Sequence, residues 1–170
     1  IKINILRCLL ERYCTVVRVP WDYDYNKESY DGLFLSNGPG NPEMYTLSIK
    51  HLRLAMKKEK TVFGICLGSQ LMALAAGAST YKLKYGHRSH NQPVRMVGTN
   101  QCYITSQNHS FAVDTKTLPD DWEPWFYNLN DETCEGIRHK TKKLSAVQFH
   151  PGASGGPTDT EFLFDDFIDQ

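Results

Sequence analysis

Cys66 lies between two glycines in the segment Phe63 to Gln70, F-G-I-C-L-G-S-Q, directly after an apolar run. This G-x-C-x-G pattern is the cysteine version of the nucleophile elbow, in which small neighbours permit a strained turn between a strand and a helix. Such a turn places the thiol at a helix N-terminus, whose amides and dipole favour the thiolate form. The pattern alone is equally typical of a small buried core residue, so other residues must decide the interpretation.

His150 is the candidate base that a thiol nucleophile needs, because it stands at the end of an expected strand. In an open α/β sheet the active site lies at the carboxyl ends of the strands, where both Cys66 and His150 are expected. The alternative is a histidine that caps a loop through a single hydrogen bond. His51, on a helix face, and His139, beside lysines, fit that alternative better.

The segment S-N-G-P-G at 36–40 also follows an expected strand and could supply an oxyanion hole. Gly38 or Gly40 could contribute one main-chain amide, and Leu67 could contribute another. The alternative is an ordinary tight turn, for which N-G-P-G would serve as well. No G-x-x-x-x-G-K-[ST] motif occurs, so the sequence shows no phosphate-binding loop of that kind.

Strands and helices alternate in the first half of the chain, which would bring these residues together. Apolar residues recur at helical spacing or form short β-branched runs, and Gly77 is a natural helix stop. The expected elements are a helix over 5–10, strands over 15–19 and 33–35, a helix over 47–56, a strand over 61–65 and a helix over 70–76. This alternation predicts an α/β fold with an open, mostly parallel sheet and helices on both faces.

The pattern weakens between 81 and 138, where short strand-like pieces are separated by Asn, Gly, Pro and Asp. Loops and antiparallel strands are expected there, followed by a strand over 144–149. The capping-box pattern T-D-T-E at 158–161 predicts a closing helix. The chain opens on a helix, whereas a crossover unit needs a strand on each side, so we expect residues 1–170 to be one domain that lacks its first strand.

Composition excludes several classes of function. The chain has 170 residues, of which 41% are hydrophobic and 22% charged, as expected for one globular domain with a sizeable core. Its 19 basic and 19 acidic residues balance, which gives no field that would favour nucleic acid or an anionic membrane. The 5 cysteines form no C-x-x-C pair, so neither a disulfide framework nor a zinc site is suggested and a cytoplasmic location fits best.

Together these motifs resemble the class I, triad-type glutamine amidotransferases. The segments G-I-C-L-G-x-Q, S-N-G-P-G, T-S-Q-N-H and Q-F-H-P stand at the spacing of that family. Two further segments, Y-G-H-R-S-H-N-Q-P-V at 85–94 and G-P-T-D-T-E-F-L-F-D at 156–165, look like the glutaminase portion of carbamoyl-phosphate synthetase, in particular of the eukaryotic pyrimidine-pathway type. The resemblance covers essentially the whole chain and implies a flavodoxin-like sheet.

The resemblance implies hydrolysis of glutamine through a thioester. Cys66 would attack the side-chain amide, and His150 would pass the proton to the departing ammonia. The positions that match the family's glutamine-binding and oxyanion residues are Gly38, Gly40, Leu67, Gln70, Asn108, Ser110 and Phe111. Of these side chains Gln70 is the strongest candidate, since a carboxamide can both donate to and accept from the substrate.

The resemblance also implies partners. The ammonia would pass to a carbamoyl-phosphate synthetase, either a large subunit or a fused domain, that uses ATP and Mg²⁺. A small N-terminal domain of the same protein would contribute to the glutamine site. No cofactor or metal is expected in the domain itself, and neither nucleic acid nor a membrane is expected as a partner.

Three residues depart from the family pattern. Gly152 replaces the glutamate that orients the histidine, Ser69 replaces a histidine, and Ser110 replaces a glycine and would be strained if the backbone needs a positive φ. Two other functions are therefore considered: a noncatalytic module that docks to the synthetase, and another thiol hydrolase such as a peptidase or γ-glutamyl hydrolase. Retention of Cys66 and His150 opposes the first, and the segment H-N-Q-P-V opposes the second.

Overall fold

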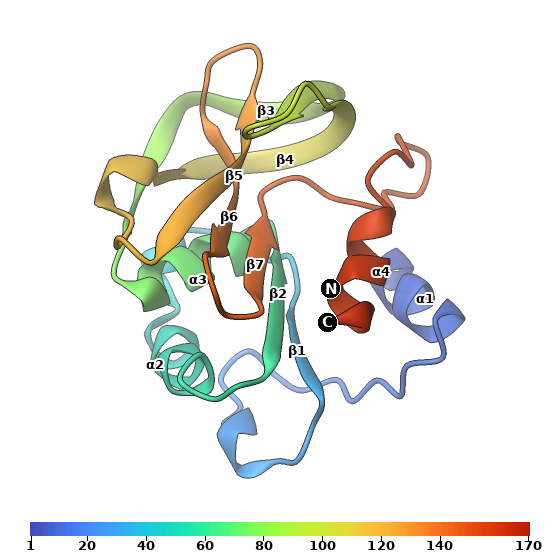
Figure 1. Ribbon diagram of the computed structural model, residues 1–170, viewed down its shortest axis with the longest axis vertical. Coiled ribbons are helices and arrows are strands. Elements are labelled where there is room, and N and C mark those ends of the chain that lie inside the picture. The colour runs from blue at the N-terminus through green and yellow to red at the C-terminus, as the bar shows by residue number, and fades with distance from the viewer.

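One sheet of seven strands forms the centre of the structure, a computed structural model that describes residues 1–170 (Figure 1). The strands are β1 (Gly32–Leu35), β2 (Thr61–Ile65), β3 (Ser79–Met96), β4 (Cys102–Asp114), β5 (Trp122–Asn128), β6 (Cys134–His139) and β7 (Leu144–Val147). The α-helices are α1 (Ile3–Glu11), α2 (Thr46–Ala55), α3 (Leu67–Ala76) and α4 (Phe162–Asp169). Short 3₁₀ helices cover Tyr25–Lys27, Pro42–Met44 and Thr115–Thr117.

The sheet has a parallel part and an antiparallel part, in the strand order β1-β2-β7-β6-β5-β3-β4. The pairs β1–β2 and β2–β7 are parallel, and the other four pairs are antiparallel. The α/β class is confirmed, with the parallel pairing in the three strands that end at the candidate site. The antiparallel strands expected between 81 and 138 are also present. β3 and β4 are longer than the predicted pieces because they pair with each other, which stabilises residues of weak β-propensity.

Helices cover both faces of the parallel strands, as the alternation predicts (Figure 1). On the face of α2 and α3, Leu52 and Met72 belong to the same apolar cluster as Val62 of β2. On the face of α1 and α4, Ile5 and Phe164 belong to a second cluster with Phe63, the next residue of β2. Successive side chains of a strand point to opposite faces, so β2 is buried on both sides and its apolar run is uninterrupted.

Three local predictions are wrong. Residues 15–19 form no strand, although they are β-branched, because no neighbouring strand supplies cross-strand contacts; Val17 is 80% exposed. The last strand ends at Val147 rather than at 149, and the chain then turns so that His150 pairs with a residue of β4. No capping box forms, since Glu161 already has helical backbone angles and no side chain caps α4.

The structure contains no helix with the length and apolar character needed to cross a bilayer.

Candidate active site

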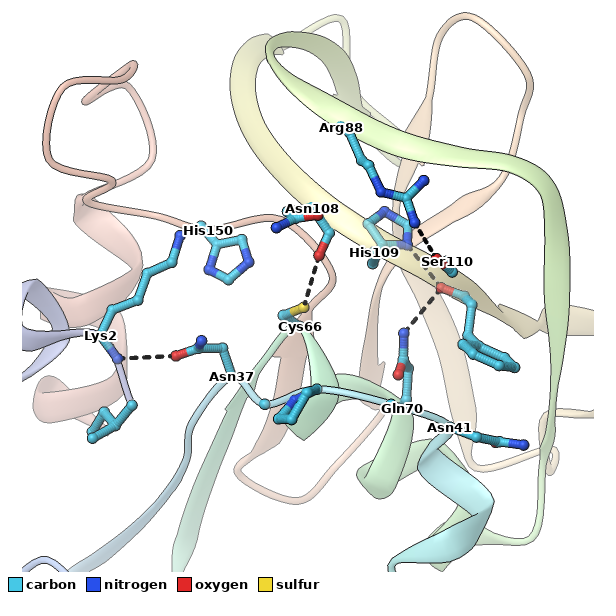
Figure 2. A pocket seen from close by; sticks show the side chains of 15 residues that line it. Lys2, Asn37, Asn41, Cys66, Gln70, Arg88, Asn108, His109, Ser110 and His150 are labelled. Atoms are coloured by element: carbon cyan, nitrogen blue, oxygen red, sulfur yellow. Dashed lines mark hydrogen bonds between the residues drawn. The ribbon is translucent and has the colours of Figure 1, made fainter.

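Segments that follow the three parallel strands meet at one cavity of about 560 Å³ (Figure 2). Gly38 and Gly40 follow β1, Cys66 follows β2, and His150 follows β7. Besides these three segments, strand β4 forms a wall of the cavity. The lining residues are Ile1, Lys2, Asn37, Gly38, Pro39, Gly40, Asn41, Cys66, Gln70, Arg88, Asn108, His109, Ser110, Phe111 and His150. Because parallel strands end at the same edge of a sheet, residues far apart in the sequence share this cavity.

Cys66 occupies a strained turn between β2 and α3. Its φ of 56° and ψ of −106° lie outside the regions that residues with a side chain normally adopt. A Cβ at Gly64 would lie 2.7 Å from the carbonyl carbon of Gly68, and one at Gly68 would overlap the carbonyl of Leu35. The Cys66 amide donates to the Val147 carbonyl at 2.9 Å, which ties the turn to β7. The turn is therefore a nucleophile elbow in which both flanking glycines are required.

The thiol of Cys66 is buried and protonated at neutral pH. Burial raises its pKa to about 11, while the Leu67 amide and the Lys2 charge act in the opposite direction. The expected support of the thiolate by the helix N-terminus is thus present, but it is smaller than the cost of removing the charge from water. The Sγ atom donates to the Asn108 carbonyl at 3.9 Å and makes no hydrogen bond to His150.

His150 is almost fully buried in the same cavity. Its amide donates to the Ser106 carbonyl at 2.9 Å, so β4 fixes the segment that follows β7. Burial lowers the pKa of the imidazole to about 4, which leaves it neutral at pH 7 and able to accept a proton. The Nδ1 atom is buried without a hydrogen-bond partner. In a complete triad a carboxylate accepts a hydrogen bond from the Nδ1–H group of the histidine.

Gly152 has a conformation that suits glycine. Its φ is +64°, and a Cβ there would lie 3.1 Å from the Cys8 Sγ atom and 3.3 Å from the Phe164 ring. The Gly152 carbonyl accepts a hydrogen bond from the Asn4 side chain. Helices α1 and α4 therefore close around this turn, and no other side chain bonds Nδ1 of His150.

The loop at 36–40 and the start of α3 supply main-chain amides beside the thiol. A Cβ at Gly38 would lie 2.6 Å from the Cδ2 methyl of Leu67, so the absence of a side chain at Gly38 permits this close approach. Gly40 adopts a φ of +84°. The Leu67 amide interacts with the Cys66 sulfur, whereas the Leu67 side chain packs in the apolar core. The structure therefore places the amide of Leu67, and not its side chain, at the candidate oxyanion position.

Gln70 is held in one orientation by two hydrogen bonds. Its Nε2 donates to the Phe111 carbonyl at 2.9 Å and to Oε1 of Gln148 at 3.0 Å. Both N–H groups of the carboxamide are therefore used within the protein. In this structure only the Oε1 atom of Gln70 is free for a substrate, as an acceptor, and donation to a substrate would require one of these two hydrogen bonds to break.

Ser110 shows no backbone strain, because its φ is not positive, although it lies on β4 opposite the irregularity between Lys82 and His87 of β3. Its hydroxyl accepts a hydrogen bond from Arg88. Asn108 and Phe111 lie on the same strand and line the cavity as well. The substitution of glycine by serine thus adds a side-chain contact instead of straining the main chain.

Several lining residues were not identified from the sequence. Asn37 and His109 stand inside the motifs S-N-G-P-G and Q-N-H, which could have indicated them. Arg88 likewise lies inside the segment Y-G-H-R-S-H-N-Q-P-V at 85–94, whereas Lys2 carried no such signal, because isolated basic residues are usually solvated. The Lys2 amide donates to Oδ1 of Asn37 at 3.1 Å, which connects the start of α1 to the loop after β1.

A buried polar network supports the β4 wall of the cavity. His109 donates from Nδ1 to the Phe111 carbonyl at 2.7 Å, and its Nε2 atom lies 3.2 Å from Nδ1 of His87. Contacts with Glu135 at 3.2 Å and Asp131 at 2.6 Å raise the pKa of His87 to about 9. Burial lowers the pKa of His109 to about 4. The positive charge therefore resides on His87, and neutral His109 holds the Phe111 carbonyl.

The fold and cavity define an α/β protein built for acyl transfer to a thiol, because a cysteine on an elbow beside a neutral base can form a thioester with an amide or ester. The sequence narrows this class: residues 1–170 match the family described as Glutamine amidotransferase class-I, and the chain belongs to that family.

Individual relatives agree with this assignment. The multifunctional protein pyr-3 of Neurospora crassa is 54% identical over 168 residues, which are 98% of this chain and 9% of that protein. The carbamoyl phosphate synthase arginine-specific small chain of Saccharomyces cerevisiae is 51% identical over 176 residues, 99% of this chain and 43% of that protein. A putative GMP synthase protein from Thermoplasma acidophilum has a similar structure, with a TM-score of 0.84 and 26% identity over 98% of this chain and 85% of that chain.

Proposed function

We propose that this chain is the glutaminase part of a carbamoyl-phosphate synthetase. Its similarity to a carbamoyl phosphate synthase small chain and to a multifunctional protein over nearly its whole length supports this assignment. The chain spans 43% of the first relative and 9% of the second, so the steps after ammonia release are assigned to other parts of the assembly.

One observation carries the proposal: a cysteine on a strained elbow and a neutral, buried histidine share a cavity that main-chain amides also line. Strain of this kind persists only where the surrounding structure enforces it, and it gathers at functional sites. A cysteine that only fills the core would need neither the positive φ nor the two flanking glycines.

In the proposed reaction the Cys66 sulfur attacks the side-chain carbonyl carbon of glutamine while the thiol proton passes to His150. The amide of Leu67 and the loop of Gly38 and Gly40 stabilise the tetrahedral oxyanion. The C–N bond then breaks, His150 protonates the leaving nitrogen, and ammonia departs from a glutamyl thioester. Water, which loses a proton to His150, then attacks the thioester. The C–S bond breaks, glutamate is released, and His150 returns the proton to the Cys66 sulfur.

The proposal includes a synthetase, as a large subunit or a fused domain, that uses ATP and Mg²⁺ and receives the ammonia. A small N-terminal domain of the same protein would complete the glutamine site. The glutaminase step itself uses only side chains and main-chain amides of this chain, so we assign it no cofactor. All five cysteines are unpaired, which supports a reducing compartment such as the cytoplasm.

A second candidate function is a docking module with impaired catalysis. The buried Nδ1 atom of His150 lacks a partner, and Gly152 offers no carboxylate to orient the imidazole. Loss of the orienting group slows proton transfer without removing the nucleophile, because a Cys/His pair depends less on a third member than a Ser/His pair.

The test measures carbamoyl phosphate formation by the full-length protein with its synthetase. Cys66→Ser should abolish synthesis from glutamine and leave synthesis from free ammonia intact, because a hydroxyl is a poor nucleophile in a site built for a thiol. Cys102→Ser, at an exposed position outside the cavity, is the matched control. Glutamine-dependent activity above a few per cent in Cys66→Ser would overturn the proposal. An unmodified protein that uses only ammonia would favour the docking module instead.

A further inference from the structure

The guanidinium of Arg88 is fixed at the cavity by two contacts. Nη1 donates to the Tyr85 carbonyl at 3.0 Å. Nη2 donates to the hydroxyl of Ser110 (Figure 2). The two contacts come from different strands, since Tyr85 lies on β3 and Ser110 on β4. A guanidinium has five N–H donors, so several donors are free for a ligand.

The backbone of β3 is shaped to admit this guanidinium. Gly86 has a φ of +70° and lies at an irregularity in the pairing with β4. A Cβ at Gly86 would lie 2.5 Å from Nη1 of Arg88 and 2.8 Å from the His109 carbonyl. Any other residue at this position would displace the guanidinium, so Gly86 and Ser110 both serve to position Arg88.

The charge of Arg88 has no partner in the protein. No carboxylate lines the cavity, and Arg88 takes part in no salt bridge. The two histidines of the lining, His109 and His150, are neutral at pH 7 because burial lowers their pKa values. A ligand of this cavity should therefore carry a negative charge at the end that approaches Arg88.

The contacts of the reactive sulfur and of the guanidinium lie two residues apart on β4, a spacing that suits the length of one amino acid. The Cys66 sulfur contacts the carbonyl of Asn108, and Arg88 contacts Ser110, two residues further along β4. Two residues of a strand span about 6.6 Å. Four C–C bonds of about 1.5 Å separate the side-chain amide carbon of glutamine from its α-carboxylate carbon. In Figure 2 His150 and Arg88 lie on opposite sides of Cys66.

We propose that Arg88, held by Ser110 and admitted by Gly86, binds the α-carboxylate of the glutamine substrate and selects for it. This inference rests on the proposed function, because it identifies the cavity as a glutamine site. Arg88 pairs with the carboxylate through charge-assisted hydrogen bonds while the side-chain amide reaches Cys66. Ser110 is a positioning residue, since it acts through Arg88.

The test compares glutamine with 4-aminobutanamide, which keeps the amide and the amine but lacks the α-carboxylate. For Arg88→Gln in the full-length protein, kcat/KM for glutamine should fall about 10- to 100-fold, mainly through KM. For the same variant, kcat/KM for 4-aminobutanamide should change less than about threefold. Arg95→Gln, on the same strand but outside the cavity, is the matched control and should leave the ratio of the two substrates unchanged. Ser110→Ala should lower the ratio of kcat/KM for glutamine to kcat/KM for 4-aminobutanamide, but less than Arg88→Gln does.

A change of the same size for both substrates, or no change for either, would overturn the role of Arg88. Binding gives a readout that does not need turnover: calorimetry of glutamine with Cys66→Ala should show affinity that the additional substitution Arg88→Gln reduces about 10- to 100-fold. If the unmodified protein hydrolyses no glutamine but this affinity depends on Arg88, the proposed glutaminase fails and the carboxylate site stands. Equal affinity with and without Arg88 overturns the site in either case.

Discussion

The thiol of Cys66 faces the main-chain carbonyl of Asn108 at 3.9 Å and is not paired with His150. Both candidate catalytic groups are neutral in this structure, because burial raises the pKa of the thiol to about 11 and lowers the pKa of the imidazole to about 4. The cavity therefore holds an uncharged acid and an uncharged base, and proton transfer between them must accompany the attack on a substrate.

We predict that alkylation of Cys66 by iodoacetamide is slow at pH 7 and accelerates about tenfold per pH unit toward pH 10, because only the thiolate reacts. Peptide mapping by mass spectrometry measures the rate at Cys66 separately from that at Cys102, an exposed cysteine that serves as an internal control. A rate at Cys66 that is already maximal at pH 7 would contradict the raised pKa.

We predict that Gly152→Ala lowers the free energy of unfolding by more than about 1–2 kcal/mol, the cost of a left-handed backbone for a residue with a Cβ. The additional loss comes from the crowded contacts with Cys8 and Phe164. Gly155→Ala is the matched control, because Gly155 also has a positive φ, +82°, but open space around it. Urea denaturation measures both variants, and equal losses would show that the packing of α1 and α4 does not restrict this turn.

The crowded position of Gly152 also determines whether a glutamate introduced there can restore the catalytic triad. A Cβ at 152 is directed at Cys8 and Phe164, between α1 and α4. We therefore expect Gly152→Glu to destabilise the protein at least as much as Gly152→Ala and to raise glutamine turnover only if the carboxylate reaches Nδ1 of His150. Turnover per folded protein, compared between the two variants, isolates the effect of the carboxylate. A higher rate in Gly152→Glu alone would show that the missing orienting group limits catalysis.

We predict that His87 makes stability depend on pH in the alkaline range. Its pKa is about 9 in the folded protein and near 6.5 when unfolded, so its stabilising contribution is complete below pH 6.5 and is lost as the pH rises through 9. Between these values the folded state holds one more proton, which gives a slope of at most about −1.4 kcal/mol per pH unit. His87→Gln should remove this slope, as measured by urea denaturation at a series of pH values. An unchanged slope would mean that Glu135 and Asp131 do not hold the proton on His87.

We predict that Gln70→Met raises KM for glutamine about tenfold and lowers the free energy of unfolding by about 1 kcal/mol. The Phe111 carbonyl and the Gln148 side chain each lose a hydrogen-bond donor, and the Oε1 acceptor of Gln70 disappears from the cavity. Gln101→Met, at an exposed position outside the cavity, is the control. A loss of stability without any change in KM would restrict Gln70 to a structural role.

Much of the candidate site could be predicted from the sequence because it depends on local sterics. The elbow at Cys66 needs Gly64, because a Cβ there would lie 2.7 Å from the carbonyl carbon of Gly68 within the same turn. Gly68 has a tertiary reason as well, since a Cβ there would overlap the carbonyl of Leu35 on β1. The end of α3 at Gly77, where φ is 102°, also has a local origin. The α/β class likewise follows from the alternation of short apolar runs, since each run must be buried on a face of the sheet.

Only the tertiary structure decided which other residues join the site and which segments become strands. Lys2 and Arg88 reach the cavity because the start of α1 approaches the loop after β1 and because β3 pairs with β4, relationships that no local pattern encodes. Residues 15–19 have the composition of a strand but lack a neighbour with which to pair. The role of the Ser110 hydroxyl became apparent only from its hydrogen bond with Arg88, which the tertiary structure provides. Local conformation depends on neighbours in sequence, whereas pairing, burial and the pKa values that follow from them depend on neighbours in space.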